Sequence, residues 1–108
     1  MATYAVYYKI PANFMPDKGL TGEQVKHSKK FFNMGVIEAK DRDDAYKKMQ
    51  GEFMSSKKLT LMNDLCKRLA SEGRMPHTSM SVGDVIYNMA NGQWWQCDMV
   101  GWIQLKGK

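Results

Sequence analysis

Alternating apolar and polar positions predict five short β-strands along the chain. The first run places Tyr4, Val6 and Tyr8 on one side and stops at Pro11, which is typical of a strand. Near the C-terminus, Asn91-Gly92 stands between two further apolar runs, and this dipeptide is the strongest short-range signal for a β-hairpin. The pattern predicts strands near residues 3–10, 32–39, 83–89, 93–99 and 102–105.

Apolar residues at three- and four-residue steps predict the helices. Five residues recur with this spacing in the clearest case, namely Leu59, Met62, Leu65, Cys66 and Leu69. They predict an amphipathic helix over residues 57–71. A second helix is expected over residues 42–50, because Asp41 is a good N-cap and acidic residues follow it in the first turn. A capping-box sequence that begins at Thr21 predicts a short helix over residues 22–30.

Together these elements predict an α+β fold. We expect a small mixed, mainly antiparallel sheet with two or three helices packed on one face, and the helices over 42–50 and 57–71 are the ones expected to cover it. The length of 108 residues fits one domain, residues 1–108, and 44% of the residues are hydrophobic, as in an ordinary globular domain.

The charge and the cysteines bear on partners and location. The net charge is +5, and the excess is spread, at +2 over residues 1–56 and +3 over residues 57–108. The two cysteines, Cys66 and Cys97, stand on different predicted elements, which favours reduced thiols and a reducing compartment. The chain starts without a secretory signal pattern and has no apolar run of membrane-spanning length. We therefore expect a cytoplasmic protein with no membrane partner.

The residue types that carry enzyme chemistry do not form a recognisable motif. Cys66 and Cys97 fall on apolar faces, and neither forms a short metal-site spacing with His27 or His77. The acidic residues that start the helix over 42–50 are explained by capping. We therefore expect no catalytic residue, no metal and no cofactor, and we expect that the protein is not an enzyme.

Basic residues gather in four short groups and leave two interpretations open. They could neutralise phosphates of a nucleic acid, or they could be solvated helix faces. The candidates for nucleic-acid binding are Lys26, Lys29, Lys30, Lys47, Lys48, Lys57, Lys58 and Arg68.

Trp94 is the candidate for a partner-binding aromatic residue. Strand alternation places Trp94 and Gln96 on one face, and Trp95, Cys97 and Met99 on the other. The second face is the expected core, which leaves Trp94 on a polar face. There it either anchors a partner or stacks on a base as an exposed side chain, or it packs beneath the loop of residues 11–20.

The sequence HTSMSVGDVI at residues 77–86 is distinctive. With the Gly92, Asp98 and Gly101-Trp102 positions that follow, it resembles the YodL-like small-domain family. The resemblance covers residues 38–105, and its specific motif lies in the last 29 of them. Gly83 stands where that family commonly has Ser, Trp102 stands where Phe is common, and the helix over 57–71 resembles an insertion.

The resemblance implies an accessory domain of phages, plasmids or other mobile elements, without known catalytic residues. The leading hypothesis is therefore a non-enzymatic phage or mobile-element accessory protein that binds a host or phage protein, in the host cytoplasm. The alternatives are a nucleic-acid-binding protein that uses an exposed Trp, and a virion or assembly component. The candidate partner-binding residues are Trp94, Gln96, His77, Ser79 and Asp84.

Overall fold

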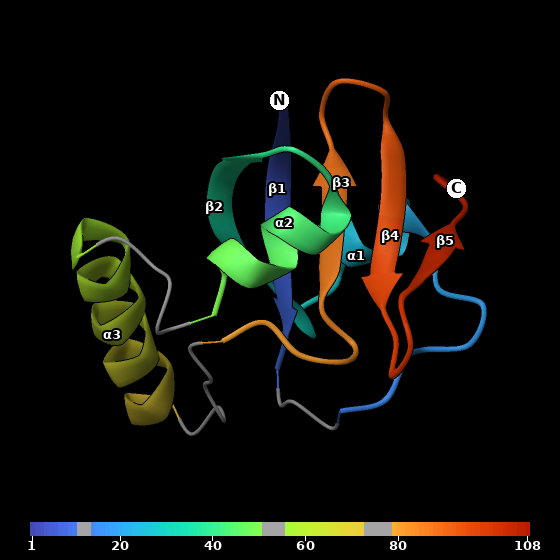
Figure 1. Cartoon of the computed structure of the whole chain (residues 1–108). Helices are drawn as coiled ribbons and strands as arrows, with labels where there is room; N and C mark the ends of the chain where they lie inside the picture. Colours follow the sequence, from blue (N-terminus) through green and yellow to red (C-terminus); the bar gives the residue numbers. More distant parts are fainter. Residues whose placement is uncertain (11–13, 51–55, 73–78) are drawn as a thin grey trace.

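The computed structural model describes residues 1–10, 14–50, 56–72 and 79–108 and contains one five-stranded sheet (Figure 1). The elements in chain order are β1 (Ala2–Lys9), α1 (Gly22–His27), β2 (Phe31–Ala39), α2 (Arg42–Lys48), α3 (Ser56–Ser71), β3 (Val85–Asn88), β4 (Gln93–Cys97) and β5 (Trp102–Leu105). The strand order is β2-β1-β3-β4-β5, and every neighbouring pair is antiparallel. The predicted α+β class is confirmed.

The turns that the sequence predicted are formed as expected. Gly92 has a φ of 75° in the β3–β4 hairpin, a backbone conformation that glycine adopts without steric cost, and the hairpin pairs Tyr87 with Trp94. At α1, the Thr21 hydroxyl accepts from the Gln24 N–H, and the Gln24 side chain accepts from the Thr21 N–H. This capping box begins the helix, which ends at His27, earlier than the predicted residue 30.

Each face of the sheet carries its own core. One face gathers Tyr8 and Ile86 from the strands with Met49, which follows α2, and Met62 of α3. The opposite face gathers Tyr7 and Trp94 with Val25 of α1, among others. Figure 1 shows α2 in front of the sheet, α1 behind it and α3 beside β2.

The helices therefore lie on both faces of the sheet. The expectation that α2 and α3 share one face is confirmed by their common core, and the third helix, α1, covers the other face. Because α1 covers that face, a polar side chain on it does not have to be exposed to solvent.

Candidate functional site

The loops that follow β1 and β4 meet at one end of the sheet. β1 and β4 both pair antiparallel with β3, so they run in the same direction and finish at the same end of the sheet. The turn that precedes β3 lies there too, since the Gly83 N–H donates to the Cys97 carbonyl at 2.9 Å. Three segments that are distant in sequence are thereby brought together.

A fully buried carboxylate holds this end of the sheet in place. Asp84 has no exposed surface, and its Oδ1 accepts from the Lys9 N–H at 2.8 Å. Its Oδ2 accepts from the Ser81 N–H at 2.9 Å. A buried carboxylate with this many main-chain partners ties the turn before β3 to the end of β1. We therefore interpret Asp84 as a structural residue.

Gln96 and the Lys9–Asp17 ion pair extend this network. Lys9 Nζ lies 2.9 Å from Asp17 Oδ1, and Asp17 Oδ2 accepts from Gln96 Nε2 at 3.1 Å. Gln96 Oε1 also accepts from the Asp17 N–H at 3.0 Å, and Nε2 donates to the Gly83 carbonyl at 3.0 Å. The network fixes the loop of residues 14–21 against β4, so the path of that loop is set by buried polar contacts.

Gly83 permits the close approach of this loop. Its φ is +99°, and a Cβ there would lie 2.8 Å from the Met15 carbonyl oxygen. A side chain would therefore be strained by the backbone and would also collide with a main-chain atom. This geometry is the physical reason for glycine at position 83.

Three of the five predicted partner-binding side chains are buried. Gln96 and Asp84 have no exposed surface, and Trp94 is 8% exposed. Asp84 and Gln96 are therefore wrong as surface contacts, whereas the small exposed part of Trp94 lines a recess on the α1 face of the sheet and its role in partner binding stays a prediction. Ser79 is half-buried and stays a prediction, and His77 lies outside the described residues.

Of the two alternatives left open for Trp94, exposure to solvent is wrong because α1 covers the indole ring. Trp94 packs against Tyr87 and Tyr7, with ring centroids 4.5 and 5.6 Å apart. A Cβ at Gly22 would overlap the indole, so α1 lies directly on it. The alternative that Trp94 is packed and buried is therefore correct, but the element that covers it is α1 and not the loop of residues 11–20. On the other face, where Met99 was expected in the core, Met99 is 82% exposed.

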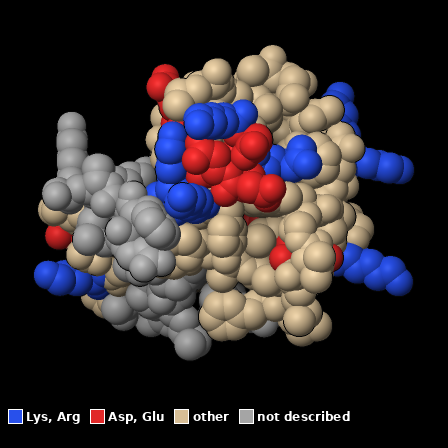
Figure 2. Space-filling model, viewed as in Figure 1, with Lys and Arg blue, Asp and Glu red and all other residues tan. Residues whose placement is uncertain are grey.

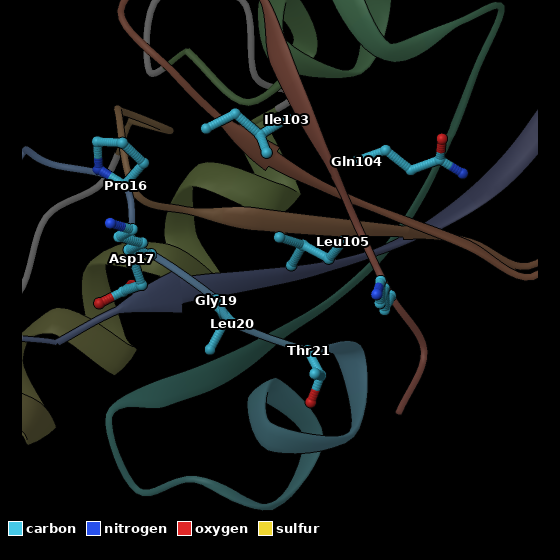
Figure 3. Close-up of a pocket in the computed structure, with 10 residues that line it drawn as sticks. Pro16, Asp17, Gly19, Leu20, Thr21, Ile103, Gln104 and Leu105 are labelled. Carbon is cyan, nitrogen blue, oxygen red and sulfur yellow. The ribbon is translucent and has the colours of Figure 1, made fainter.

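A groove with a volume of about 600 Å³ lies beside β5. One wall is the 16–21 loop, which brings Pro16 and Leu20, and the other is β5, which brings Ile103 and Leu105. Figure 3 shows the Ile103 and Leu105 side chains pointing to the loop side of β5, and Gln104 pointing away from it. The groove is therefore lined by apolar side chains along one face of an edge strand.

The outer edge of β5 carries main-chain groups that β4 does not use. The Asp98 N–H donates to the Gly101 carbonyl at 3.0 Å, so these two residues form a hydrogen-bonded pair. Beyond this turn, the facing residues of β4 and β5 alternate between non-hydrogen-bonded and hydrogen-bonded pairs. The Trp95–Gln104 pair is then non-bonded, and the Gln104 N–H and C=O point away from β4. No described residue pairs with them, and only farther along does the Lys106 carbonyl accept from the Gly22 N–H, at 2.7 Å.

Lys18 and Lys106 give the groove a positive border. Both residues line it and both are exposed. The acidic residue of the lining, Asp17, is already paired with Lys9. The groove therefore combines an unpaired strand edge, an apolar recess and two cations.

The cysteines show no sign of an activated thiol. Burial, with a smaller contribution from Asp84 and Asp98, raises the pKa of the Cys97 thiol to about 11. Burial also raises the pKa of the Cys66 thiol. Because the thiolate is the nucleophile, both residues are poorly suited to covalent catalysis. Within the described ranges, no group of three or more His, Cys, Asp or Glu residues is placed to share a metal ion.

The acidic residues around α2 act as caps and ion-pair partners. The Asp41 side chain accepts from the Asp44 N–H at 2.8 Å. A hydrogen bond from the Lys40 N–H, followed by the interaction with Lys48, holds the pKa of Asp44 below its ordinary value. Figure 2 shows this acidic group surrounded by Lys and Arg side chains. The capping interpretation is confirmed for Asp41.

The predicted nucleic-acid-binding residues do not form one surface. Lys26 lies on α1, with Lys29 and Lys30 in the turn after it, whereas Lys47 and Lys48 lie on α2, across the sheet. Arg68 lies on α3, with its guanidinium 5.6 Å from the Phe32 ring centre. The side chains of Lys57 and Lys58 lie outside the described residues. The described candidates are thus divided between two faces.

Comparisons with family models, curated proteins and solved structures found no match to this chain. The resemblance to the YodL-like family therefore stays a prediction. In the part of the chain that the structure describes, no helix has the length and apolar character needed to cross a membrane.

Of the site features, the β5 groove was missed by sequence reasoning. Its two walls, residues 16–21 and 103–106, are far apart in the chain. A local signal did exist, because the strand predicted near 102–105 is short, and short strands are common at sheet edges.

Proposed function

We propose that this protein is a non-enzymatic binding domain that takes up an extended segment of a partner protein along the outer edge of β5. The observation that carries the proposal is the unpaired main chain at Gln104 next to the groove between the 16–21 loop and β5. An exposed strand edge pairs readily with a strand from another chain, and pockets for alternate side chains then supply specificity.

The groove defines the chemistry of the partner segment. A strand added beside β5 sends alternate side chains to the face on which Ile103 and Leu105 lie, and these side chains enter the recess that Leu20 and Pro16 close. An apolar side chain is favoured there because it removes apolar surface from water. Lys18 and Lys106 favour an acidic residue beside it.

The biological setting is proposed from the family resemblance. A phage or mobile-element accessory protein acts on proteins of its host or of the phage, and an extended segment of such a protein is the ligand we propose. The role as a virion or assembly component predicts the protein in purified particles, which mass spectrometry of those particles tests.

A matched pair of substitutions at one residue tests the strand-pairing mechanism. Gln104→Pro removes the outward N–H, and proline is tolerated on edge strands. Gln104→Ala removes the same side chain but keeps the N–H. We expect Gln104→Pro to weaken partner binding about tenfold, through one lost hydrogen bond and the steric bulk of the ring, and Gln104→Ala to bind as the unmodified protein does.

The groove itself is tested by charge. Ile103→Lys places a cation in the recess, and Val36→Lys places one at a 55% exposed position on β2 as the control. Partners are first captured from nuclease-treated host lysate, and the segment is mapped as synthetic peptides that are titrated against all four variants. Equal peptide affinities for Gln104→Pro and Gln104→Ala, or for Ile103→Lys and Val36→Lys, would contradict the proposal, provided that circular dichroism shows folded protein.

A further inference from the structure

A second recess, of about 330 Å³, lies on the α1 face of the sheet and is separate from the β5 groove. Three aromatic residues line it, one from each of three neighbouring strands: Tyr7 of β1, Tyr87 of β3 and Trp94 of β4. The rings are in contact, since Trp94 packs on both tyrosines. The volume is at the lower end of the range for small-molecule sites.

The aromatic lining has hydrogen-bond donors that the protein does not use. Tyr7 and Trp94 are each 8% exposed, yet within the described residues neither the Tyr7 hydroxyl nor the Trp94 indole N–H has a hydrogen-bond partner. Among the described residues, Arg42 Nε is the buried side-chain nitrogen or oxygen that lacks a hydrogen-bond partner, so the Tyr7 hydroxyl and the Trp94 N–H are not sealed from solvent and can donate to a ligand in the recess. Burial, with a contribution from Tyr87, raises the pKa of Tyr7, so its hydroxyl keeps its proton and remains a donor at neutral pH.

The rim of the recess carries positive charge. Lys26 and His27 come from the last turn of α1 and Lys108 from the end of the chain, and all three are exposed. Glu23 is the acidic side chain among the residues that line the recess. A ligand that fits must therefore be anionic at one end and must offer hydrogen-bond acceptors and a flat ring to the aromatic lining.

We propose that this recess binds a single phosphate-bearing nucleotide unit, with its phosphate at Lys26 and Lys108 and its base against Tyr87 and the donors of Tyr7 and Trp94. Tyr87 is only half-buried, so its ring is available for stacking, which is worth a large part of base binding in proteins. Base nitrogens and carbonyl oxygens accept from the two donors. The phosphate pairs with the cations through charge-assisted contacts.

The same chemistry is offered by a free mononucleotide and by the end of a single strand. Trp94 is covered by α1 and is not an exposed stacking platform, so the site takes one base and not a continuous strand. An acidic peptide would satisfy the cations but would leave the aromatic lining without a ring to stack.

The test follows the indole N–H resonance of Trp94 by NMR while ligand is added. We expect AMP to shift this resonance and to saturate it with a dissociation constant of about 1 mM or tighter. Inorganic phosphate and an acidic peptide are expected to leave it in place. A shift with AMP alone identifies the free nucleotide as the source, and a shift with a 5′-phosphorylated oligonucleotide alone identifies a strand end.

Two variants, each with a matched control, make the assignment specific. Lys26→Glu reverses a charge at the rim and is expected to weaken AMP binding at least about tenfold, whereas Lys40→Glu reverses an exposed charge outside the recess and is expected to leave it unchanged. Tyr87→Phe keeps the ring and is expected to leave stacking intact, while Tyr87→Ala is expected to abolish binding.

The proposal is overturned by any of three results. These are the absence of a saturable shift with both AMP and the oligonucleotide, an equal shift with inorganic phosphate, and equal affinities for Lys26→Glu and Lys40→Glu. The site does not depend on the β5 groove, so these results leave the proposed protein-binding function untouched.

Discussion

For Gly22→Ala, tertiary packing and local helix propensity predict changes of opposite sign in the free energy of unfolding. Gly22 is the first residue of α1, and its φ is not positive. On helix propensity, alanine should therefore be the better residue, by up to about 1 kcal/mol. Packing gives the opposite expectation, because the new Cβ would overlap the Trp94 indole.

The magnitude follows from how little the indole can move. Trp94 is 8% exposed and packs against Tyr87 and Tyr7, so these two rings and α1 restrict its movement even though it borders the recess on this face. Overpacking a filled core typically costs about 1–3 kcal/mol. Because the new Cβ would overlap three atoms of the indole ring, the upper part of this range applies, about 2–3 kcal/mol. After a propensity gain of about 1 kcal/mol is subtracted, we expect Gly22→Ala to lower the free energy of unfolding by about 1–2 kcal/mol. For a domain of this size that corresponds to a loss of about 4–16 °C in Tm.

Urea unfolding of four proteins measures the effect and its cause. The set is the unmodified protein, Gly22→Ala, Trp94→Phe and the double variant. Phenylalanine is smaller than tryptophan, so the cost of Gly22→Ala should fall by at least about 0.5 kcal/mol in the Trp94→Phe background, as expected for residues in contact. A neutral or stabilising Gly22→Ala, or equal costs in the two backgrounds, would refute the packing argument.

Three further predictions concern Asp84 and the two cysteines. Asp84→Asn keeps the shape of the side chain but replaces an acceptor oxygen by an amide NH₂ that faces an N–H of Lys9 or Ser81. The free energy of unfolding, measured in urea, should therefore fall by about 1–3 kcal/mol. A change below about 0.5 kcal/mol would argue against the network. The raised pKa of Cys97, about 11, means that its contribution to stability is complete below the ordinary value of 9.0 and is lost as the pH rises toward 11. Urea midpoints should therefore decline over that pH range, and the decline should be less steep in Cys97→Ala; equal slopes would contradict this. At pH 8 a thiol reagent should modify the half-buried Cys66 before Cys97. Mass spectrometry of the folded protein measures this order, and faster labelling of Cys97 would contradict it.

The elements themselves were predictable because their signals are local. A capping box spans four residues, and the Thr21–Gln24 contacts form as that pattern predicts. The turn at Gly92 needs only a residue that tolerates a φ of 75°. The helix predicted over 57–71 is observed as Ser56–Ser71, since its apolar spacing is set by helix geometry alone.

The accessibility of the candidate residues was not predictable in this way. Alternation correctly placed Trp94 and Gln96 on one face of β4 but indicated the wrong environment for that face. Gln96 is polar and nevertheless has no exposed surface, because Asp17, 79 residues away, satisfies its amide. Period-two patterning shows which side chains share a face, and it does not show what covers that face.

The sequence by itself determined the class of fold, the helix starts and the β3–β4 hairpin, since each depends on contacts between residues close in the chain. Only the tertiary structure decided that α1 covers Trp94, that the buried Asp84 joins the turn before β3 to the end of β1, and that β5 has a free edge beside the 16–21 loop. These features depend on which distant segments pack together. That outcome follows from burial and hydrogen bonding summed over the whole chain, and no local pattern encodes it.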